Sequence, residues 1–276
     1  MRHKLLLAYD GSDWAGWQKQ RNATGIQQLL EDRLGQIAGQ EIRVIGAGRT
    51  DAGVHALGQA AHFDLEWPHP PEALVQALQS RLPRSVHIRG VERVADAFHA
   101  RFSSTAKRYV YRYYAGRADP FAGRVAWSLG HWQLDLAAMN TAAATLLGEH
   151  DFSAFGANPR DDRTESPVKR LTRLSLHRQG PYVTLVTEAS GYLYKMVRSL
   201  AGCLADVGRG KLPPAALAEI LSSRQRTARV VTAPPEGLFL AGVDYGTGFP
   251  AALGAEGLPG FLAAIEEAPA SSDGPF

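Results

Sequence analysis

Residues 46–64, GAGRTDAGVHALGQAAHFD, join a glycine-rich loop to an apolar run that is typical of a strand. Asp51 lies in this loop between Gly48 and Gly53, two positions after Arg49. The two glycines allow a tight loop that presents Asp51, and Arg49 can keep the carboxylate ionised. Such a carboxylate can act as a nucleophile or general base. Spacing alone favours a simpler structure, a Gly-Asp turn in which the side chain caps its own backbone.

The apolar pattern on both sides of this loop predicts alternating strands and helices. Thr24 and Gln27 have the spacing of a capping box at the start of the first helix. We expect strands at 3–10, 41–46, 57–65 and 85–95, and helices at 26–39 and 71–82. The resulting order, strand, helix, strand, strand, helix, strand, is that of a ferredoxin-like unit.

A comparable series follows from residue 107, where alternation places Tyr109, Tyr111 and Tyr113 on one face of a strand. Further strands are expected at 168–178, 181–189 and 238–245, and helices at 135–147, at 192–207 and after Pro214. We therefore predict an α+β protein of two ferredoxin-like (RNP-like) halves, with mainly antiparallel sheets forming a central cleft. The domains are placed at 1–105, which carries the Asp51 loop, and at 106–245, followed by an acidic Gly/Ala/Pro-rich tail at 246–276.

The net charge of +3 is a sum over unlike parts. Residues 246–276 carry four acidic and no basic side chains, so residues 1–245 hold 30 basic against 23 acidic side chains. Of the 30 basic residues 24 are arginine, and residues 81–124 alone hold ten basic against three acidic side chains. This distribution fits a polyanionic partner, although a solvated surface explains the charge equally well.

Several classes of protein are excluded by what the sequence lacks. Cys203 is the single cysteine, which rules out an internal disulfide and a cysteine-based metal cluster. The sequence contains no Walker loop, G-x-G-x-x-G, H-E-x-x-H or G-x-S-x-G motif, and its histidines lack ligand spacing. No stretch approaches the roughly 20 apolar residues that cross a bilayer. We expect a soluble cytoplasmic protein without a metal or nucleotide cofactor.

Residues 46–64 resemble the hallmark segment of the tRNA pseudouridine synthase A (TruA) family. Five further segments match that family in order, from residue 9 to residue 245. They are YDGSDWAGWQKQ (9–20), FHARFSSTAKRYVYRYY (98–114), GEHDFSAF (148–155), YLYKMVRSLAGCLADVGRG (192–210) and APPEGLFLAGVDY (233–245). The RTDAGVHA element is highly specific, and the order of the other segments supports it.

The resemblance implies a role for five residues. Asp51 falls on the family's nucleophile, and Arg198 on the basic residue that pairs with it. Tyr109 falls on the tyrosine that stacks on the target uracil and serves proton transfer from C5, and Leu238 on a leucine that packs under the base. Arg49 matches an arginine that helps to extrude or replace the base. Without the resemblance, Tyr109 would be an ordinary strand aromatic, Arg198 a solvated charge and Leu238 a core leucine.

The activity implied is the isomerisation of uridine to pseudouridine at positions 38, 39 and 40 of the tRNA anticodon arm by a homodimer. The reaction needs no cofactor, because it involves no redox change and no added group. The sequence leaves open whether Asp51 attacks C1′ or C6, or acts through a glycal. Candidate phosphate contacts are the segment 81–124, the basic residues Arg160, Arg163, Lys169 and Arg170, and the helix with Lys195, Arg198, Arg209 and Lys211.

Two other functions remain open at this stage. A non-catalytic RNA-binding protein of paired RNP-like modules would use the tyrosine strand as a stacking platform. An acid/base hydrolase would use Asp51 together with Asp10 or Asp13, and it requires that a second carboxylate lie close to Asp51.

Overall fold

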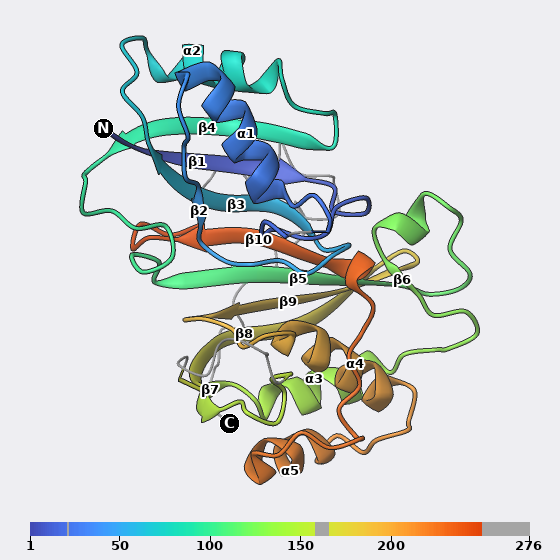
Figure 1. Cartoon of the computed structure of the whole chain (residues 1–276). Helices are drawn as coiled ribbons and strands as arrows, with labels where there is room; N and C mark the ends of the chain where they lie inside the picture. The colour runs from blue at the N-terminus through green and yellow to red at the C-terminus, as the bar shows by residue number, and fades with distance from the viewer. Residues whose placement is uncertain (21, 158–165, 250–276) are drawn as a thin grey trace.

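The computed structural model describes residues 1–20, 22–157 and 166–249, which form a mixed α+β protein with one large, mostly antiparallel sheet (Figure 1). The strands are β1 (Arg2–Tyr9), β2 (Ile45–Gly46), β3 (His55–Asp64), β4 (Val86–Val94), β5 (Ala106–Tyr114), β6 (Trp127–Ser128), β7 (Gly148–Asp151), β8 (Val168–Gln179), β9 (Tyr182–Ala189) and β10 (Leu238–Asp244). The helices are α1 (Ile26–Ala38), α2 (Pro71–Gln79), α3 (Leu136–Ala144), α4 (Met196–Gly208) and α5 (Ala216–Ser223), with 3₁₀ turns η1 (Ala122–Arg124) and η2 (Pro235–Gly237).

The strand order β4-β1-β3-β10-β5-β9-β8-β7 joins the whole chain into a single sheet. β10, the last of the described strands, lies between β3 and β5, and it pairs parallel with β3 and antiparallel with β5. We expected two halves whose mainly antiparallel sheets form a central cleft. The structure instead makes them continuous, because β10 occupies the position at which the strands of the first half would otherwise end.

Two predicted features of the first helix differ from the structure. The N-cap of α1 is Gly25, and no side chain caps the helix there. The predicted capping box of Thr24 and Gln27 is therefore wrong. The Gln27 amide donates instead to the Val44 carbonyl at 3.0 Å, and the Val44 N–H donates to Glu31 at 3.1 Å. Because helix side chains take the hydrogen bonds of this segment, the strand expected at 41–46 is reduced to Ile45–Gly46.

The second long helix begins later than periodicity predicted. Lys195 has a left-handed φ of 58°, and α4 starts at the next residue, not at 192. Strand β7 was not predicted from its polar sequence, Gly-Glu-His-Asp, and it exists because it pairs with β8. The other predicted strands and helices agree with the structure to within a few residues.

The helices cover one face of the sheet, and a common core lies between them and the strands (Figure 1). Tyr109, Tyr111 and Tyr113 face this core, which confirms the predicted alternation along β5. The Tyr111 hydroxyl donates to the Pro234 carbonyl, and the Tyr113 hydroxyl to the Ala201 carbonyl, each at 2.9 Å. These bonds tie β5 to α4 and to the segment before β10.

A small second cluster occupies the opposite face of the central strands. It contains Leu57, Val110, Val186 and Phe239.

In the described part of the chain, no helix is long and apolar enough to cross a membrane.

The close packing of α4 against residues 231–233 gives a test of this fold. A Cβ on Gly202 would lie 2.1 Å from the Val231 carbonyl oxygen. Alanine usually stabilises a helix by about 1 kcal/mol relative to glycine, but here the added carbon forces backbone to move. We expect Gly202→Ala to lower the free energy of unfolding in urea by about 1–3 kcal/mol.

Gly90→Ala is the matched control, because nothing lies within 4 Å of the carbon it adds. That variant should stay within about 0.5 kcal/mol of the unmodified protein. A stabilised Gly202→Ala protein would contradict the described packing of α4.

Candidate active site

The loop that carries Asp51 is held from beneath by buried polar groups. The Tyr9 hydroxyl lies 2.8 Å from the Thr50 hydroxyl, and the Gln59 amide donates to the Gly48 carbonyl at 2.8 Å. Tyr9 and Gln59 are 4% and 0% exposed, so water does not compete for these bonds. The loop is therefore fixed at Gly48 and at Thr50, three residues and one residue before the carboxylate.

A second segment packs against the loop at very short range. The Trp17 N–H donates to the Thr50 carbonyl at 3.0 Å, and a Cβ on Gly16 would lie 2.5 Å from that same oxygen. Gly53 has a φ of +78°, as its place after Asp51 led us to expect, whereas Gly48 is not among the glycines with positive φ. The conformational freedom of glycine is thus needed at Gly16 and Gly53, not at Gly48.

Asp51 forms an ion pair with Arg198, in which Nη1 donates to Oδ2 at 2.7 Å. The Arg198 Nε donates to the Ala233 carbonyl at 2.8 Å, and the Ala233 N–H returns a bond to the Arg198 carbonyl at 3.0 Å. The side chains of Arg198 and Asp51 are 12% and 23% exposed. The guanidinium is thus fixed before it meets the carboxylate, and the pair is partly shielded from solvent.

Tyr109 lies beside the same loop. Its hydroxyl is 3.6 Å from the position that a Cβ on Gly48 would take, and the residue is 7% exposed. The ring of Tyr192 meets the Tyr109 ring edge-on at 5.0 Å between centroids, which fixes the plane of Tyr109. The structure therefore brings Tyr109, Asp51 and Arg198 together from three distant parts of the sequence.

Leu238 and Arg49 complete the set of predicted residues. Leu238 is the first residue of β10 and is 6% exposed. It pairs with Tyr111, and Leu240 pairs with Tyr109, so Leu238 lies on the same face as Tyr109 and one pair further along. Arg49 is exposed on the loop, two residues before Asp51.

Three buried side chains near the loop had no predicted role. Tyr9 and Gln59 support the loop, and His55 follows it at 2% exposure. Tyr9 continues the alternation of Leu5 and Leu7, which was a signal that it faces the core. Scattered histidines had been assigned to surface or core, and His55 lies in the core.

Several arginines expected to contact phosphate are engaged within the protein. Arg112 is 2% exposed, lies 3.9 Å from the Tyr182 ring centroid, and has its pKa lowered by burial to about 10. Arg108 pairs with Glu188 at 2.9 Å, and Arg124 pairs with Asp10 and Asp13 at 3.2 Å each. Arg112 is therefore not a phosphate contact. Arg160 and Arg163, which were also predicted to contact phosphate, lie outside the described residues.

The pairing of Asp10 and Asp13 with Arg124 also bears on the hydrolase alternative. Asp10 accepts from Ser12 and lies 3.2 Å from the His55 Nδ1, so its contacts are distinct from those of Asp51. Asp13 is 78% exposed. Neither carboxylate shares the guanidinium that holds Asp51, and the paired carboxylates of an acid/base hydrolase have no support.

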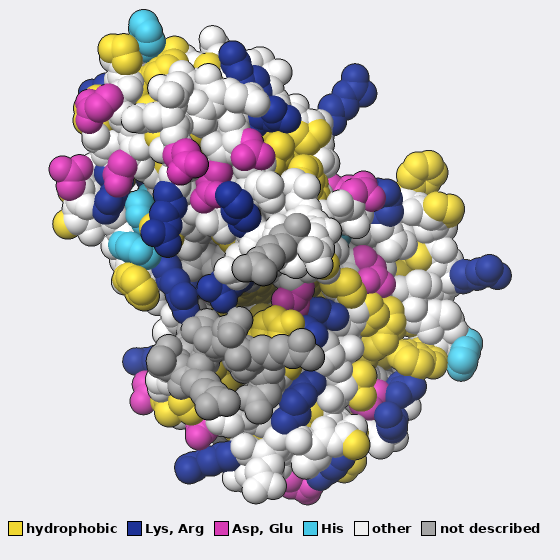
Figure 2. All heavy atoms as spheres, in the orientation of Figure 1, with side chains coloured by type: hydrophobic (Ala, Val, Ile, Leu, Met, Phe, Trp, Pro, Cys, Tyr) yellow, Lys and Arg dark blue, Asp and Glu magenta, His cyan; other side chains and the backbone are white. Residues whose placement is uncertain are grey.

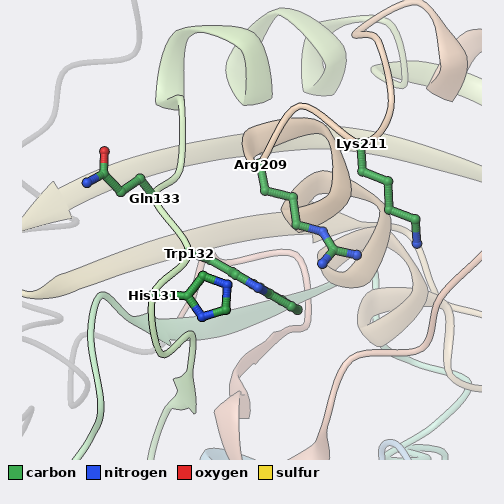
Figure 3. A pocket seen from close by; sticks show the side chains of 5 residues that line it. All are labelled: His131, Trp132, Gln133, Arg209 and Lys211. Carbon is green, nitrogen blue, oxygen red and sulfur yellow. The ribbon is translucent and has the colours of Figure 1, made fainter.

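A shallow hollow of about 570 Å³ lies at the far end of α4 (Figure 3). Its lining comprises His131, Trp132, Gln133, Arg209 and Lys211. Arg209 stacks on Trp132 at 4.1 Å, and both cations pair with the buried Asp206. At ~1.5 Å per residue, α4 separates Arg209 from Arg198 by roughly 16 Å.

Basic side chains gather across the middle of the face shown in Figure 2. Within the described ranges, no group of three or more His, Cys, Asp or Glu side chains could hold a metal ion.

The chain is similar to known proteins over most of its length. The model of the tRNA pseudouridine synthase family matches residues 6–103 and 142–246. A tRNA pseudouridine synthase A of Afipia carboxidovorans is 43% identical over 246 residues, 88% of this chain and 99% of that protein. One of Methylobacillus flagellatus is 41% identical over 262 residues, 94% of this chain and 96% of that protein. The chain belongs to the tRNA pseudouridine synthase family.

The hydroxyl of Tyr9 gives a test of how the loop is held. We expect Tyr9→Phe to lower the free energy of unfolding by about 1–2 kcal/mol, because the Thr50 hydroxyl loses a buried partner. The same change should lower kcat for pseudouridine formation, because the residue next to Asp51 is released. Urea denaturation and a turnover assay with tRNA measure the two effects.

Tyr245→Phe is the control, since it removes a 2.9 Å bond to the Ala100 carbonyl beyond the other end of β10. It should cost similar stability and leave kcat unchanged. Equal kcat in both variants would contradict a supporting role for Tyr9.

Proposed function

We propose that this protein isomerises uridine to pseudouridine in tRNA, with Asp51 as the nucleophile. The observation that carries the proposal is the 2.7 Å pair of Asp51 with Arg198, on a loop that the Tyr109 hydroxyl approaches at Gly48. A carboxylate fixed by a guanidinium is oriented for attack, and an aromatic face next to it can hold a base. Membership of the family supports the same reaction.

The reaction breaks the N1–C1′ bond, turns the uracil while it stays bound, and joins C5 to C1′. Asp51 supplies the nucleophilic oxygen, and Arg198 fixes its direction and balances its charge. Tyr109 stacks on the uracil and serves the proton transfer from C5, and Leu238 packs under the base. The low exposure of these side chains keeps water from reaching C1′, where it would cause hydrolysis.

A uridine within a stem is accessible only when it is turned out of the helix, at a cost of a few kcal/mol. Arg49 is exposed next to Asp51, where it can fill the space that the base leaves. We assign the targets to positions 38, 39 and 40 of the anticodon arm. Backbone phosphates offset the cost through exposed cations, including Lys211, which is 54% exposed. The enzyme acts in the cytoplasm as an RNA-binding homodimer without a cofactor.

The chain is further proposed to consist of two ferredoxin-like halves, 1–105 and 106–245, with 246–276 as a tail. The order β1-α1-β2-β3-α2-β4, with β1 between β3 and β4, supports this division for the first half. The proposed boundary falls where β5 begins. Asp51 then comes from the first half, and Tyr109, Arg198 and Leu238 come from the second.

Asp51→Asn tests the nucleophile. We expect pseudouridine formation to be abolished, because the amide cannot attack carbon, while the Kd for tRNA stays within several-fold. Asp13→Asn is the control and should retain full turnover, since that carboxylate is 78% exposed and pairs with Arg124 at the surface. Turnover by Asp51→Asn would show that Asp51 is not the nucleophile.

The same assay separates the enzyme from a non-catalytic RNA-binding protein. Release of tritium from tRNA labelled at uracil C5 reports substitution at that carbon. The unmodified protein should release it in step with pseudouridine formation, whereas a protein that only binds RNA releases none.

Phosphate contacts predict a steep salt dependence of tRNA binding. Each contact contributes about 0.7–0.9 to the slope of log affinity against log salt, so four contacts give a slope of about −3. Lys211→Gln should reduce the magnitude of this slope by about 1. Arg224→Gln, at a side chain 72% exposed, should not change it. Affinity indifferent to ionic strength would refute phosphate-dominated binding.

A further inference from the structure

His55 is a buried histidine that starts β3, close behind the Asp51 loop. The Gly11 N–H donates to its Nδ1 at 3.1 Å, and its Nε2 lies 3.0 Å from the Arg124 carbonyl and 3.2 Å from the Glu236 carbonyl. The imidazole also stacks on Phe239 at 4.7 Å between centroids. One side chain thus contacts three segments that are far apart in the sequence, around Gly11, around Arg124 and at 236–239.

These contacts define the protonation of the ring. Because Gly11 donates to Nδ1, the proton of the neutral ring sits on Nε2, which donates to the two carbonyl groups. Burial lowers the pKa of His55, which agrees with a neutral ring. Asp10 lies 3.2 Å from Nδ1, and its carboxylate is also held by Ser12 and Arg124.

The segments that His55 joins are those that build the candidate site. Gly11 begins the segment that packs on the loop, and a Cβ there would lie 2.0 Å from the Val54 carbonyl. Glu236 lies in η2, between Ala233, which binds Arg198, and Leu238. Arg124 is the last residue of η1, and its side chain pairs with Asp10 and Asp13.

We propose that His55 is a positioning residue, which sets the Asp51 loop at a fixed distance from residues 233–238, the segment that anchors Arg198 and leads to Leu238. The proposal rests on the function assigned to Asp51 above. Its physical basis is that the ring satisfies one N–H and two carbonyl groups of three segments at once. The slightly larger apolar ring of phenylalanine can keep the stack on Phe239, but it leaves these groups without their partner.

The test compares His55→Phe with a matched variant, His62→Phe. His62 lies on the same strand and the same face, is 3% exposed, and its Nδ1 accepts from the Ala100 N–H at 3.1 Å. Both changes replace a buried imidazole by a larger apolar ring and remove a hydrogen bond to backbone. Only the His55 change loosens the segments around Asp51.

We expect both variants to lower Tm, and only His55→Phe to lower kcat at saturating tRNA. The fall should be ~10-fold or more, because small displacements of reacting groups cost up to about 100-fold in rate. The Kd for tRNA should stay within about threefold, since these contacts lie on the face of the sheet away from the helices. Assays are run well below the lower Tm, so that only folded protein is measured.

Two conservative variants test the contacts of Nδ1 and of Nε2 separately. His55→Asn places an acceptor near Nδ1 for the Gly11 N–H, and His55→Gln places a donor near Nε2 for the carbonyl groups. Each should restore part of the kcat that phenylalanine loses. If His55→Phe does not fold, kcat of these two against His62→Asn and His62→Gln decides the question.

The proposal is overturned if the folded His55 variants keep the kcat of the unmodified protein, or if the His62 variants lose as much. This failure is distinct from failure of the assigned function. Turnover by Asp51→Asn would contradict the function assigned to Asp51. An inactive Asp51→Asn protein together with fully active His55 variants would contradict only the positioning role of His55.

Discussion

The Asp51–Arg198 pair sets a constraint on the whole fold, because each partner is fixed by a different part of the chain. Asp51 depends on the loop that Tyr9, Thr50 and Gln59 hold, and Arg198 depends on its bonds to Ala233. A 2.7 Å contact leaves little tolerance, so the sheet between them must be rigid. The continuous strands β3, β10 and β5 provide that rigid base, and both side chains of the pair are largely shielded from solvent.

Much of this fold could be predicted from local pattern. The alternation of Tyr109, Tyr111 and Tyr113 and the apolar periodicity of α1 depend only on which residues face the core. The errors arose where long-range contacts outweighed local signals. Gln27 resembles a capping residue, but its amide binds Val44, and the sequence contains no sign of that competition. Lys195 adopts a left-handed conformation that no residue other than glycine or asparagine would suggest, and α4 starts later as a result.

The candidate site shows the same division. The loop motif and its resemblance located Asp51, Tyr109, Arg198 and Leu238, and the structure brings these residues to one region. The charge pattern was less informative, because it cannot distinguish a solvated arginine from one such as Arg112, which is buried against Tyr182. The supporting residues were not predictable, since a buried histidine is recognised only by the backbone groups around it. Their arrangement depends on tertiary packing of segments that are not neighbours in sequence.

The place of β10 in the sheet has a consequence for the order of events during synthesis. β3 and β5 can form early, yet the strand that joins them is made near the end of the described chain. Contacts of such high sequence separation form late, because closing a long loop costs entropy before any pairing repays it. On the ribosome, the N-terminal strands therefore wait with one edge open until β10 emerges. A nascent chain that ends before residue 233 lacks both Leu238 and the Ala233 anchor of Arg198, so competence for catalysis is acquired only after β10 has been made.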